Sequence, residues 1–240
     1  MRTSHLPDVY RCATRPGAAA LLICACLMGA WPGGSGLPSP NTEGRDSVKE
    51  FVRQFEMSYR SVFSLKADFT QTYLQGGRRR VESGSVVFAR GGRMRWDYRE
   101  PVSKLFLSDG KKLLFYVPEE KQLTRTAVKS SEDFRLPFSL LLSRLSLSKV
   151  FSRVEFADQA LESASGNRIL RGFPKPDSAE DYHDVLIELT PEFDVARLVV
   201  SYIDQSRMEF TFNHVARNVL LKPSLFQFVP PADTEIIEQR

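Results

Sequence analysis

Apolar and polar residues alternate strictly on the C-terminal side of two adjacent glycines at positions 91 and 92. Met94, Trp96 and Tyr98 take every second position there, and charged residues take the positions between them. Because successive side chains of a β-strand point to opposite faces, the three large apolar residues share one face. The pattern therefore predicts a β-hairpin over residues 85–98 with one solvent-exposed face and one strongly apolar face.

The length of the turn decides which residues face each other across this hairpin. A loop of the two glycines alone would pair Phe88 with Arg95. A three-residue loop that includes Arg90 would instead place Phe88 beside Met94. We favour the second register because it collects the bulky apolar residues on one side, and it leaves Arg90 at the rim of the apolar face.

A change in hydrophobic period separates a predicted N-terminal helix from a predicted sheet. Apolar residues recur at helical spacing over residues 47–62, and Ser47 with Glu50 fits a capping box, so an amphipathic helix is expected there. From residue 65 onward the period is two, and Asp109 with Gly110 between two apolar runs indicates a second hairpin. Further strands are expected at residues 122–128, 154–156, 168–173, 184–190, 197–203, 209–214 and 226–229.

Residues 132–151 interrupt the β pattern and are predicted to form one or two short helices, with Pro137 near a start. Their apolar residues fall on nearly all sides of a helix, so this segment must be buried from several directions. Two interpretations remain open at this point. The segment is either an ordinary buried helix or a lid that covers an apolar cavity.

Charge and composition narrow the classes of partner. The chain is 42% hydrophobic and 26% charged, which is ordinary for a globular protein, and its net charge is +4 with scattered basic residues. That is too little positive charge for a nucleic-acid-binding surface. Three consecutive arginines at residues 78–80 are expected at a turn, as a solvated loop or, in the sharper alternative, as a contact with anionic lipid.

Residues 1–36 have the features of an export signal followed by a flexible leader. Basic residues precede an apolar run at residues 18–30, which is shorter than the roughly 20 residues that a membrane-spanning helix needs. We therefore expect export with cleavage, and an uncleaved anchor is the alternative. All three cysteines lie in this segment, and Cys26, in a stretch that loosely resembles a lipobox, is the candidate for lipidation. The remaining residues, 37–240, are expected to form a single domain.

No recognisable catalytic or cofactor-binding motif is present: no nucleophile elbow, zinc-protease motif, phosphate-binding glycine loop or dinucleotide fingerprint. Beyond residue 36 the chain has two histidines, His183 and His214, which are expected at the surface. An acidic cluster at residues 180–184 has no sugar cleft predicted around it. We therefore predict a non-enzymatic protein, without cofactor or metal, whose apolar sheet face could hold hydrocarbon.

Several short motifs follow one another in a fixed order from about residue 48 to the C-terminus. They are Phe69-Thr-Gln71, Phe88-Ala-Arg90 leading to Trp96, Ser108-Asp-Gly-Lys111 followed by Phe115-Tyr116, Pro137-Phe138 and Phe226-Gln-Phe-Val-Pro-Pro231. Each motif is weak by itself. Together, and after an export signal, they resemble the LolA-type outer-membrane lipoprotein carriers of the Gram-negative periplasm.

The resemblance implies a mainly β fold with helices (α+β). The implied fold is an unclosed antiparallel half-barrel whose concave apolar face is covered by an N-terminal helix and a central helical lid. It also implies a monomeric periplasmic carrier that binds the acyl chains of lipoprotein cargo between sheet and lid. The expected partners are an inner-membrane ABC-type lipoprotein-releasing complex and an outer-membrane lipoprotein acceptor, with no cofactor and no nucleic acid.

The resemblance also assigns roles to residues of this sequence. Arg90 falls on the family's lid-latching arginine, and we expect it to donate to backbone carbonyls of the helical segment. Met94 takes a pocket position that is usually phenylalanine, and Gly91 replaces a usual proline. The expected acyl-binding face consists of Phe69, Val86, Phe88, Met94, Trp96, Leu105, Phe138 and Leu141.

Three alternatives to this carrier stay open. The first is a LolB-like outer-membrane lipoprotein acceptor, which shares the fold and would need Cys26 to be lipidated. The second is a carrier or sensor of another lipid in the same fold. The third is a structural or interaction protein whose sheet and helices enclose a solid core.

Overall fold

Twelve β-strands form a single sheet within the residues that the computed structural model describes, which are 40–128, 146–157, 166–176 and 182–239. Residues 39–240 form one compact unit. The helical elements are α1 (Pro40–Ser58), α3 (Leu147–Val150) and the 3-10 helix η3 (Pro223–Phe226). The strands are β1 (Ser64–Gln75), β2 (Arg78–Ala89), β3 (Arg93–Glu100), β4 (Lys104–Asp109), β5 (Lys112–Val117), β6 (Gln122–Ala127), β7 (Phe151–Phe156), β8 (Arg168–Pro174), β9 (Tyr182–Leu189), β10 (Val195–Tyr202), β11 (Arg207–Arg217) and β12 (Glu235–Glu238).

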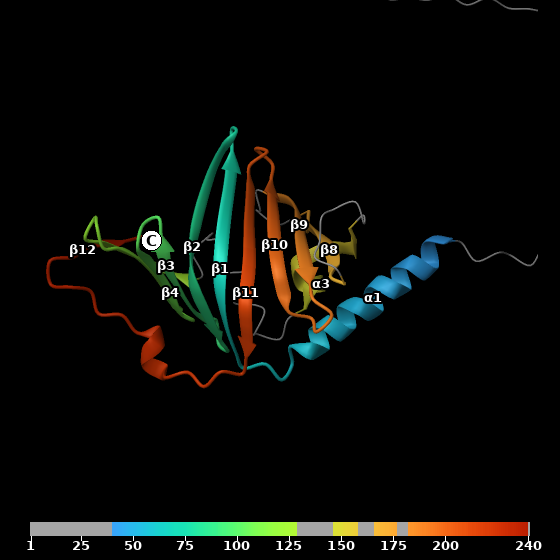
Figure 1. The fold of residues 1–240 in the computed structure, drawn as a ribbon, viewed down its shortest axis with the longest axis horizontal. Helices are drawn as coiled ribbons and strands as arrows, with labels where there is room; N and C mark the ends of the chain where they lie inside the picture. The colour runs from blue at the N-terminus through green and yellow to red at the C-terminus, as the bar shows by residue number, and fades with distance from the viewer. Residues whose placement is uncertain (1–39, 129–145, 158–165, 177–181, 240) are drawn as a thin grey trace, which may run out of the picture. The chain divides into compact units, whose positions relative to one another are not determined.

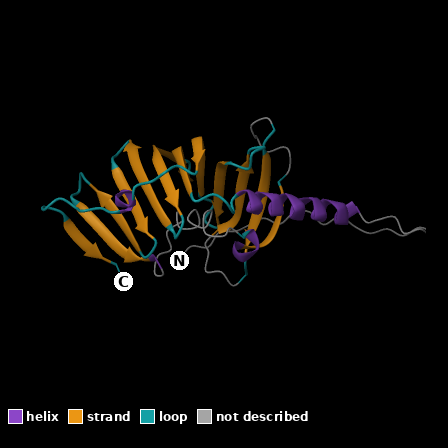
Figure 2. Cartoon of the chain, turned by 90° about the horizontal axis from the view of Figure 1, so that it is seen from below, coloured by secondary structure: helices purple, strands orange, loops and turns teal. Residues whose placement is uncertain are grey.

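The sheet is open, because its two edge strands do not pair with each other. The strand order is β12-β6-β5-β4-β3-β2-β1-β11-β10-β9-β8-β7. Strands that follow each other in sequence pair antiparallel from β1 to β6 and from β7 to β11, and β1 joins the two halves by pairing antiparallel with the distant β11. Only β12, among the described strands, runs parallel to its neighbour. Figures 1 and 2 show the strands side by side in one curved row, so the predicted unclosed antiparallel sheet is confirmed.

The β2–β3 hairpin has the predicted three-residue loop. Phe88 faces Met94 and Val86 faces Trp96 across the ladder, which confirms the favoured register. Gly91 and Gly92 have φ angles of 82° and 73°, a left-handed conformation that other residues adopt only with strain. The turn chemistry therefore fixes the register, and the register places the large apolar residues on one face.

Helix α1 begins and ends earlier than predicted. It starts at Pro40, a residue suited to the first turn of a helix, and it ends at Ser58 rather than at residue 62. Ser47 and Glu50 lie inside the helix, so the predicted capping box is wrong, and Glu50 instead pairs with Arg53 at 2.6 Å. The apolar spacing continues past the helix end because a turn, in which the Val62 amide donates to the Tyr59 carbonyl, still points Val62 at the core.

We call the sheet face on which α1 packs the inner face. Phe51 of α1 lies 5.3 Å from Phe156 of β7 and 5.2 Å from Phe193 of the β9–β10 turn, measured between ring centroids. Phe55 is completely buried in the same cluster. The helix thus covers the part of the sheet around β7 to β10. Among the described residues, no helix is long and apolar enough to cross a membrane.

The C-terminal segment differs from the prediction. Residues 226–229 do not form a strand: Phe226 ends η3, and its ring packs on the outer face against Val87 and Ala89. Phe228 lies 4.9 Å from Tyr116. The two prolines that follow remove backbone donors from this stretch, and the chain pairs again only at β12, which the sequence did not indicate.

The structure corrects the expected arginine turn, and it describes only a small part of the predicted helical segment. The arginines at residues 78–80 begin β2 instead of forming a turn, because Gly76 and Gly77 make the turn with positive φ angles. Of the predicted helical segment, only α3 and its flanks are described, and residues 132–145 lie outside the described residues. The export signal and leader at residues 1–36 lie outside them as well.

Candidate functional site

The inner face of β1 to β4 and β11 carries one layer of buried, mostly aromatic side chains, which we call the apolar wall. Trp96 lies near its middle and is completely buried. Its ring contacts Phe69 at 4.9 Å and Phe210 at 5.5 Å, both in edge-on geometry that aromatic pairs favour. The wall comprises Phe69, Val86, Phe88, Met94, Trp96, Phe106, Phe210 and Phe212.

Five of the predicted acyl-binding residues are brought together in this wall, namely Phe69, Val86, Phe88, Met94 and Trp96. Leu105 is not, and its placement on this face is wrong. Leu105 pairs with Asp97, whereas its neighbour Phe106 pairs with Trp96 and points inward. Leu105 instead packs on the outer face, in a cluster with Leu107, Tyr116 and Leu123.

The run from Leu105 to Leu107 explains the error, because three consecutive apolar residues give no alternation from which to choose a face. The outer face needs apolar residues here because the C-terminal segment covers it. The other two predicted face residues, Phe138 and Leu141, lie outside the described residues.

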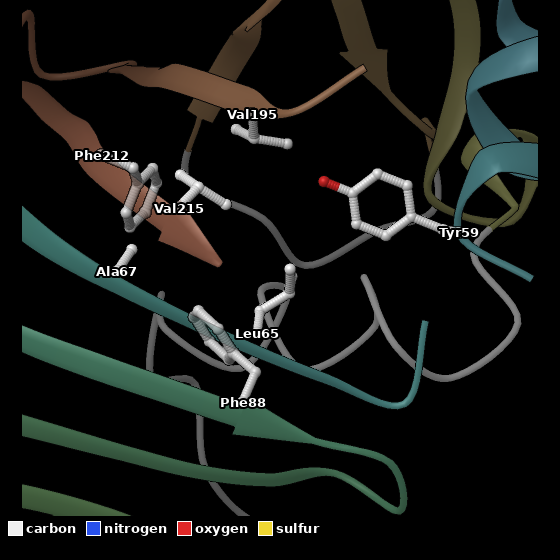
Figure 3. A pocket seen from close by; sticks show the side chains of 7 residues that line it. All are labelled: Tyr59, Leu65, Ala67, Phe88, Val195, Phe212 and Val215. Atoms are coloured by element: carbon white, nitrogen blue, oxygen red, sulfur yellow. The ribbon is translucent and has the colours of Figure 1, made fainter. Parts of the chain in front are cut away.

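A small pocket opens at the end of the apolar wall nearest α1 (Figure 3). Tyr59 approaches from the end of α1, opposite side chains of β1, β2 and β11. The volume of the pocket is about 20 Å³, which is close to what a single water molecule needs. An acyl chain could therefore enter only if the lining side chains move apart. The lining residues are Tyr59, Leu65, Ala67, Phe88, Val195, Phe212 and Val215.

Tyr59 keeps this pocket uncharged. Burial raises the pKa of Tyr59 to about 12, against a smaller opposing effect of Arg217, whose guanidinium lies 4.8 Å from the ring centroid. Arg217 itself is held by Asp194 at 2.6 Å. The phenol is therefore neutral at physiological pH, and the pocket lining suits a hydrocarbon ligand.

The raised pKa of Tyr59 predicts a loss of stability in alkali. The unfolded chain releases the phenol proton near pH 10, whereas the folded chain holds it to about pH 12. Folding therefore becomes less favourable as pH rises through this window, by about 2 kcal/mol at its upper end. Urea unfolding at several pH values should show this decline. Tyr59→Phe should reduce it, and an equally steep decline in Tyr59→Phe would contradict the assignment.

Arg90 connects the β2–β3 hairpin to the loop between α1 and β1. Its Nε donates to the Val62 carbonyl at 3.1 Å and its Nη2 donates to the Arg60 carbonyl at 2.5 Å. Its backbone amide donates to the Phe63 carbonyl at 3.2 Å. Arg90 thus anchors the segment between Tyr59 and Leu65, two residues that line the pocket. Its predicted bonds to the helical segment stay a prediction, because residues 132–145 lie outside the described residues.

A polar network marks the other end of the apolar wall. The Tyr98 hydroxyl donates to Gln71 Oε1 at 2.7 Å, and both side chains are buried. Lys104 Nζ bonds Glu82 Oε1 at 2.5 Å and lies 4.9 Å from the centroid of the Tyr98 ring. Because these groups satisfy one another, hydrocarbon gains nothing by displacing them. The apolar part of the inner face therefore extends from this network to the Arg90 end.

Sequence reasoning missed part of the pocket. Leu65 and Ala67 alternate with polar residues ahead of Phe69, which was a usable signal for the inner face. Val215 carried no such signal, because His214 has a φ angle of 52° and the regular pairing of β11 with β1 is interrupted there. This bulge turns Val215 into the pocket and leaves His214 exposed, 3.0 Å from Asp68.

Other chemistry is sparse in the described part of the chain, where no three potential metal ligands come together. His183 and His214 are exposed. Of the acidic cluster at residues 180–184, the described Asp184 is buried and paired with Arg171. Asp184, His183 and His214 each contact a neighbouring charged side chain, and the apolar wall with its pocket is the remaining candidate site among the described residues.

The fold and the site together define a class of protein: an open antiparallel sheet whose inner face is an aromatic wall, flanked by an amphipathic helix. The model of one family, outer membrane lipoprotein carrier protein LolA, matches residues 60–229. This chain belongs to the LolA family.

Relatives agree with the family match. A protein of Nitrosospira multiformis is 30% identical over 204 residues, covering 82% of this chain and 89% of the relative. A protein of Methylococcus capsulatus is 31% identical over 182 residues, covering 75% of this chain and 84% of the relative. Both are named outer-membrane lipoprotein carrier protein. A crystal structure of an uncharacterized conserved protein from Thermus thermophilus shares the fold, with a TM-score of 0.50, 11% identity, and coverage of 80% of this chain and 99% of that one.

Proposed function

We propose that this chain is a monomeric, non-enzymatic periplasmic carrier that shields the acyl chains of outer-membrane lipoproteins. It takes them from an inner-membrane ABC-type releasing complex and gives them to an outer-membrane acceptor. Residues 1–36 direct export and are removed, and residues 37–240 form the carrier domain. The observation that carries the proposal is the apolar wall of an open sheet, which ends in an uncharged pocket beside Tyr59.

The energetics of hydrocarbon explain why such a carrier is needed. Three acyl chains hold about 40 methylenes, and exposing them to water costs on the order of 30 kcal/mol at ~0.8 kcal/mol each. Recovering all of that energy in the carrier would trap the cargo, since affinities saturate near ~20 kcal/mol. A useful carrier therefore binds incompletely and releases its cargo to a better acceptor. A tightly packed wall with a pocket of only about 20 Å³ fits that need, because opening it costs part of the binding energy.

Photocrosslinking tests this proposal at a position that the pocket defines. A photoreactive aliphatic residue at Val215, which lines the pocket, should capture lipoprotein acyl chains in cells, and mass spectrometry of the adduct should identify them. The control is the same residue at Ala216, the next position in β11, which is exposed. Equal capture at both positions would contradict binding in the pocket.

The identity of the adduct separates the alternatives. Capture of a free lipid at Val215 would support a carrier or sensor of that lipid instead. Absence of any adduct, together with no binding of a fluorescent fatty-acid probe, would support a protein with a solid core. A mature N-terminus at a lipidated Cys26, found by mass spectrometry, would support the outer-membrane acceptor.

A further inference from the structure

The turns at one end of the sheet carry a basic surface that the carrier role does not use. The β1–β2 turn at Gly76 and Gly77 and the β10–β11 turn at residues 203–206 lie side by side there (Figure 1). A hydrogen bond from Gln75 Nε2 to Asp204 Oδ2 at 3.2 Å joins them. We call residues 74–81 and 203–207 the arginine tip. It lies at the opposite end of β2 from Arg90, since β2 runs from Arg78 to Ala89.

The charge of the arginine tip is one-sided. It contains Arg78, Arg79, Arg80 and Arg207 against the single acid Asp204, a formal charge of +3. Arg78 and Arg79 are exposed and have no ion-pair partner among the described residues, whereas Arg80 lies 3.8 Å from Glu82 and Arg207 lies 3.3 Å from Glu209. Strand alternation directs Arg79 to one face of the hairpin and its two neighbours to the other. The tip therefore presents positive charge on both sides.

Exposed apolar side chains accompany these arginines. Ile203 is 68% exposed in its turn, and Leu74 and Val81 are 37% and 36% exposed on the hairpin. Leu74 faces Arg79 directly across the β1–β2 ladder. Arginines beside protruding aliphatic residues match the boundary between lipid headgroups and acyl chains, where the cation meets phosphate and the aliphatic group meets hydrocarbon.

We propose that the arginine tip is a membrane-contact surface that docks reversibly on a bilayer containing anionic phospholipid. Arg78, Arg79 and Arg80 bind the headgroup phosphates, and Ile203 enters the headgroup layer. Charge complementarity favours an anionic lipid surface, and the exposed isoleucine favours a lipid over a highly charged protein partner. The proposal does not depend on which cargo the apolar wall holds, because it concerns the cargo-free protein and a different part of the fold.

Vesicle flotation with the purified, cargo-free protein tests this surface. The protein should bind vesicles of phosphatidylcholine with phosphatidylglycerol, and it should not bind phosphatidylcholine alone. High salt should release it, because exposed charges are screened. The triple substitution Arg78→Gln, Arg79→Gln and Arg80→Gln should lower the partition to anionic vesicles on the order of a hundredfold, at roughly fivefold per arginine. Ile203→Ser should lower it severalfold.

A charge-matched control distinguishes the effect of the arginine tip on vesicle binding from the effect of the protein's net charge. Lys111→Gln, Lys112→Gln and Lys222→Gln remove three exposed cations elsewhere and should leave vesicle binding nearly unchanged. An equal loss in both triple variants, or equal binding to neutral vesicles, would overturn the proposal. No binding by the unaltered protein would overturn it too, and would point to an acidic protein partner. Fatty-acid probe binding, measured alongside, reports on the carrier role separately and should be the same in all variants.

Discussion

Replacing Trp96 with alanine is expected to lower the free energy of unfolding by about 4 kcal/mol, a large part of the total stability of a domain. Trp96 is completely buried and contacts Phe69, Phe88 and Phe210. Its removal would leave a cavity in the middle of the apolar wall and forfeit three edge-on aromatic contacts. Urea unfolding at equilibrium measures the change.

Two further variants make the Trp96 prediction specific. Trp96→Phe keeps an aromatic ring and should lose less than half as much stability. Phe63→Ala removes a phenyl ring that is 41% exposed, and it should cost about 1 kcal/mol or less. Similar losses from Trp96→Ala and Phe63→Ala would mean that the wall is not a packed layer in solution.

Fatty-acid binding in Trp96→Phe connects the wall to function. If acyl chains lie on the wall, a bound fatty-acid probe should raise the unfolding midpoint of the unaltered protein, because it binds only the folded state. The smaller ring should change the size of this shift, since the probe touches the altered surface. An identical shift in both proteins would place the probe elsewhere.

Arg90→Leu is expected to accelerate amide hydrogen exchange in residues 60–63 at least tenfold, because it removes two hydrogen bonds from a charged donor and the loss of either one is equivalent to about tenfold. Arg90 bonds the carbonyls of Arg60 and Val62, and leucine can bond neither. Because Tyr59 and Leu65 flank these residues, loosening the loop also frees the pocket. Exchange followed by mass spectrometry reports each segment separately.

The same measurement tests the latch. If Arg90 also holds the helical segment over the apolar wall, exchange in residues 132–151 should rise in Arg90→Leu, and cargo transfer to the acceptor should change. Arg99→Leu is the control, because Arg99 is an exposed arginine at the other end of β3 whose side chain pairs with Asp68 and not with the loop between α1 and β1. Unchanged exchange in residues 132–151 and unchanged transfer would reject the latch, whatever happens at residues 60–63.

Local pattern predicted the elements well wherever one face of a strand is polar. Alternation around Met94 and Trp96, together with the φ angles that only glycines 91 and 92 accept easily, was enough to predict both the hairpin and its register. The same reasoning failed at Leu105, where apolar residues occupy both faces. It also failed at the start of α1, because residues 40–46 lack the apolar spacing by which a helix is recognised.

By itself the sequence determined that this protein has a series of many antiparallel strands with one apolar face, since alternation and turn residues act over a few neighbours. Only the tertiary structure decided which residues make the site. The pairing of β1 with β11 brings Leu65 and Val215 into the lining of one pocket, although they are far apart in the chain and no local pattern encodes their proximity. Likewise, Phe106 and not Leu105 belongs to the apolar wall. The C-terminal segment covers the outer face of β4, and that face therefore carries the apolar residues Leu105 and Leu107.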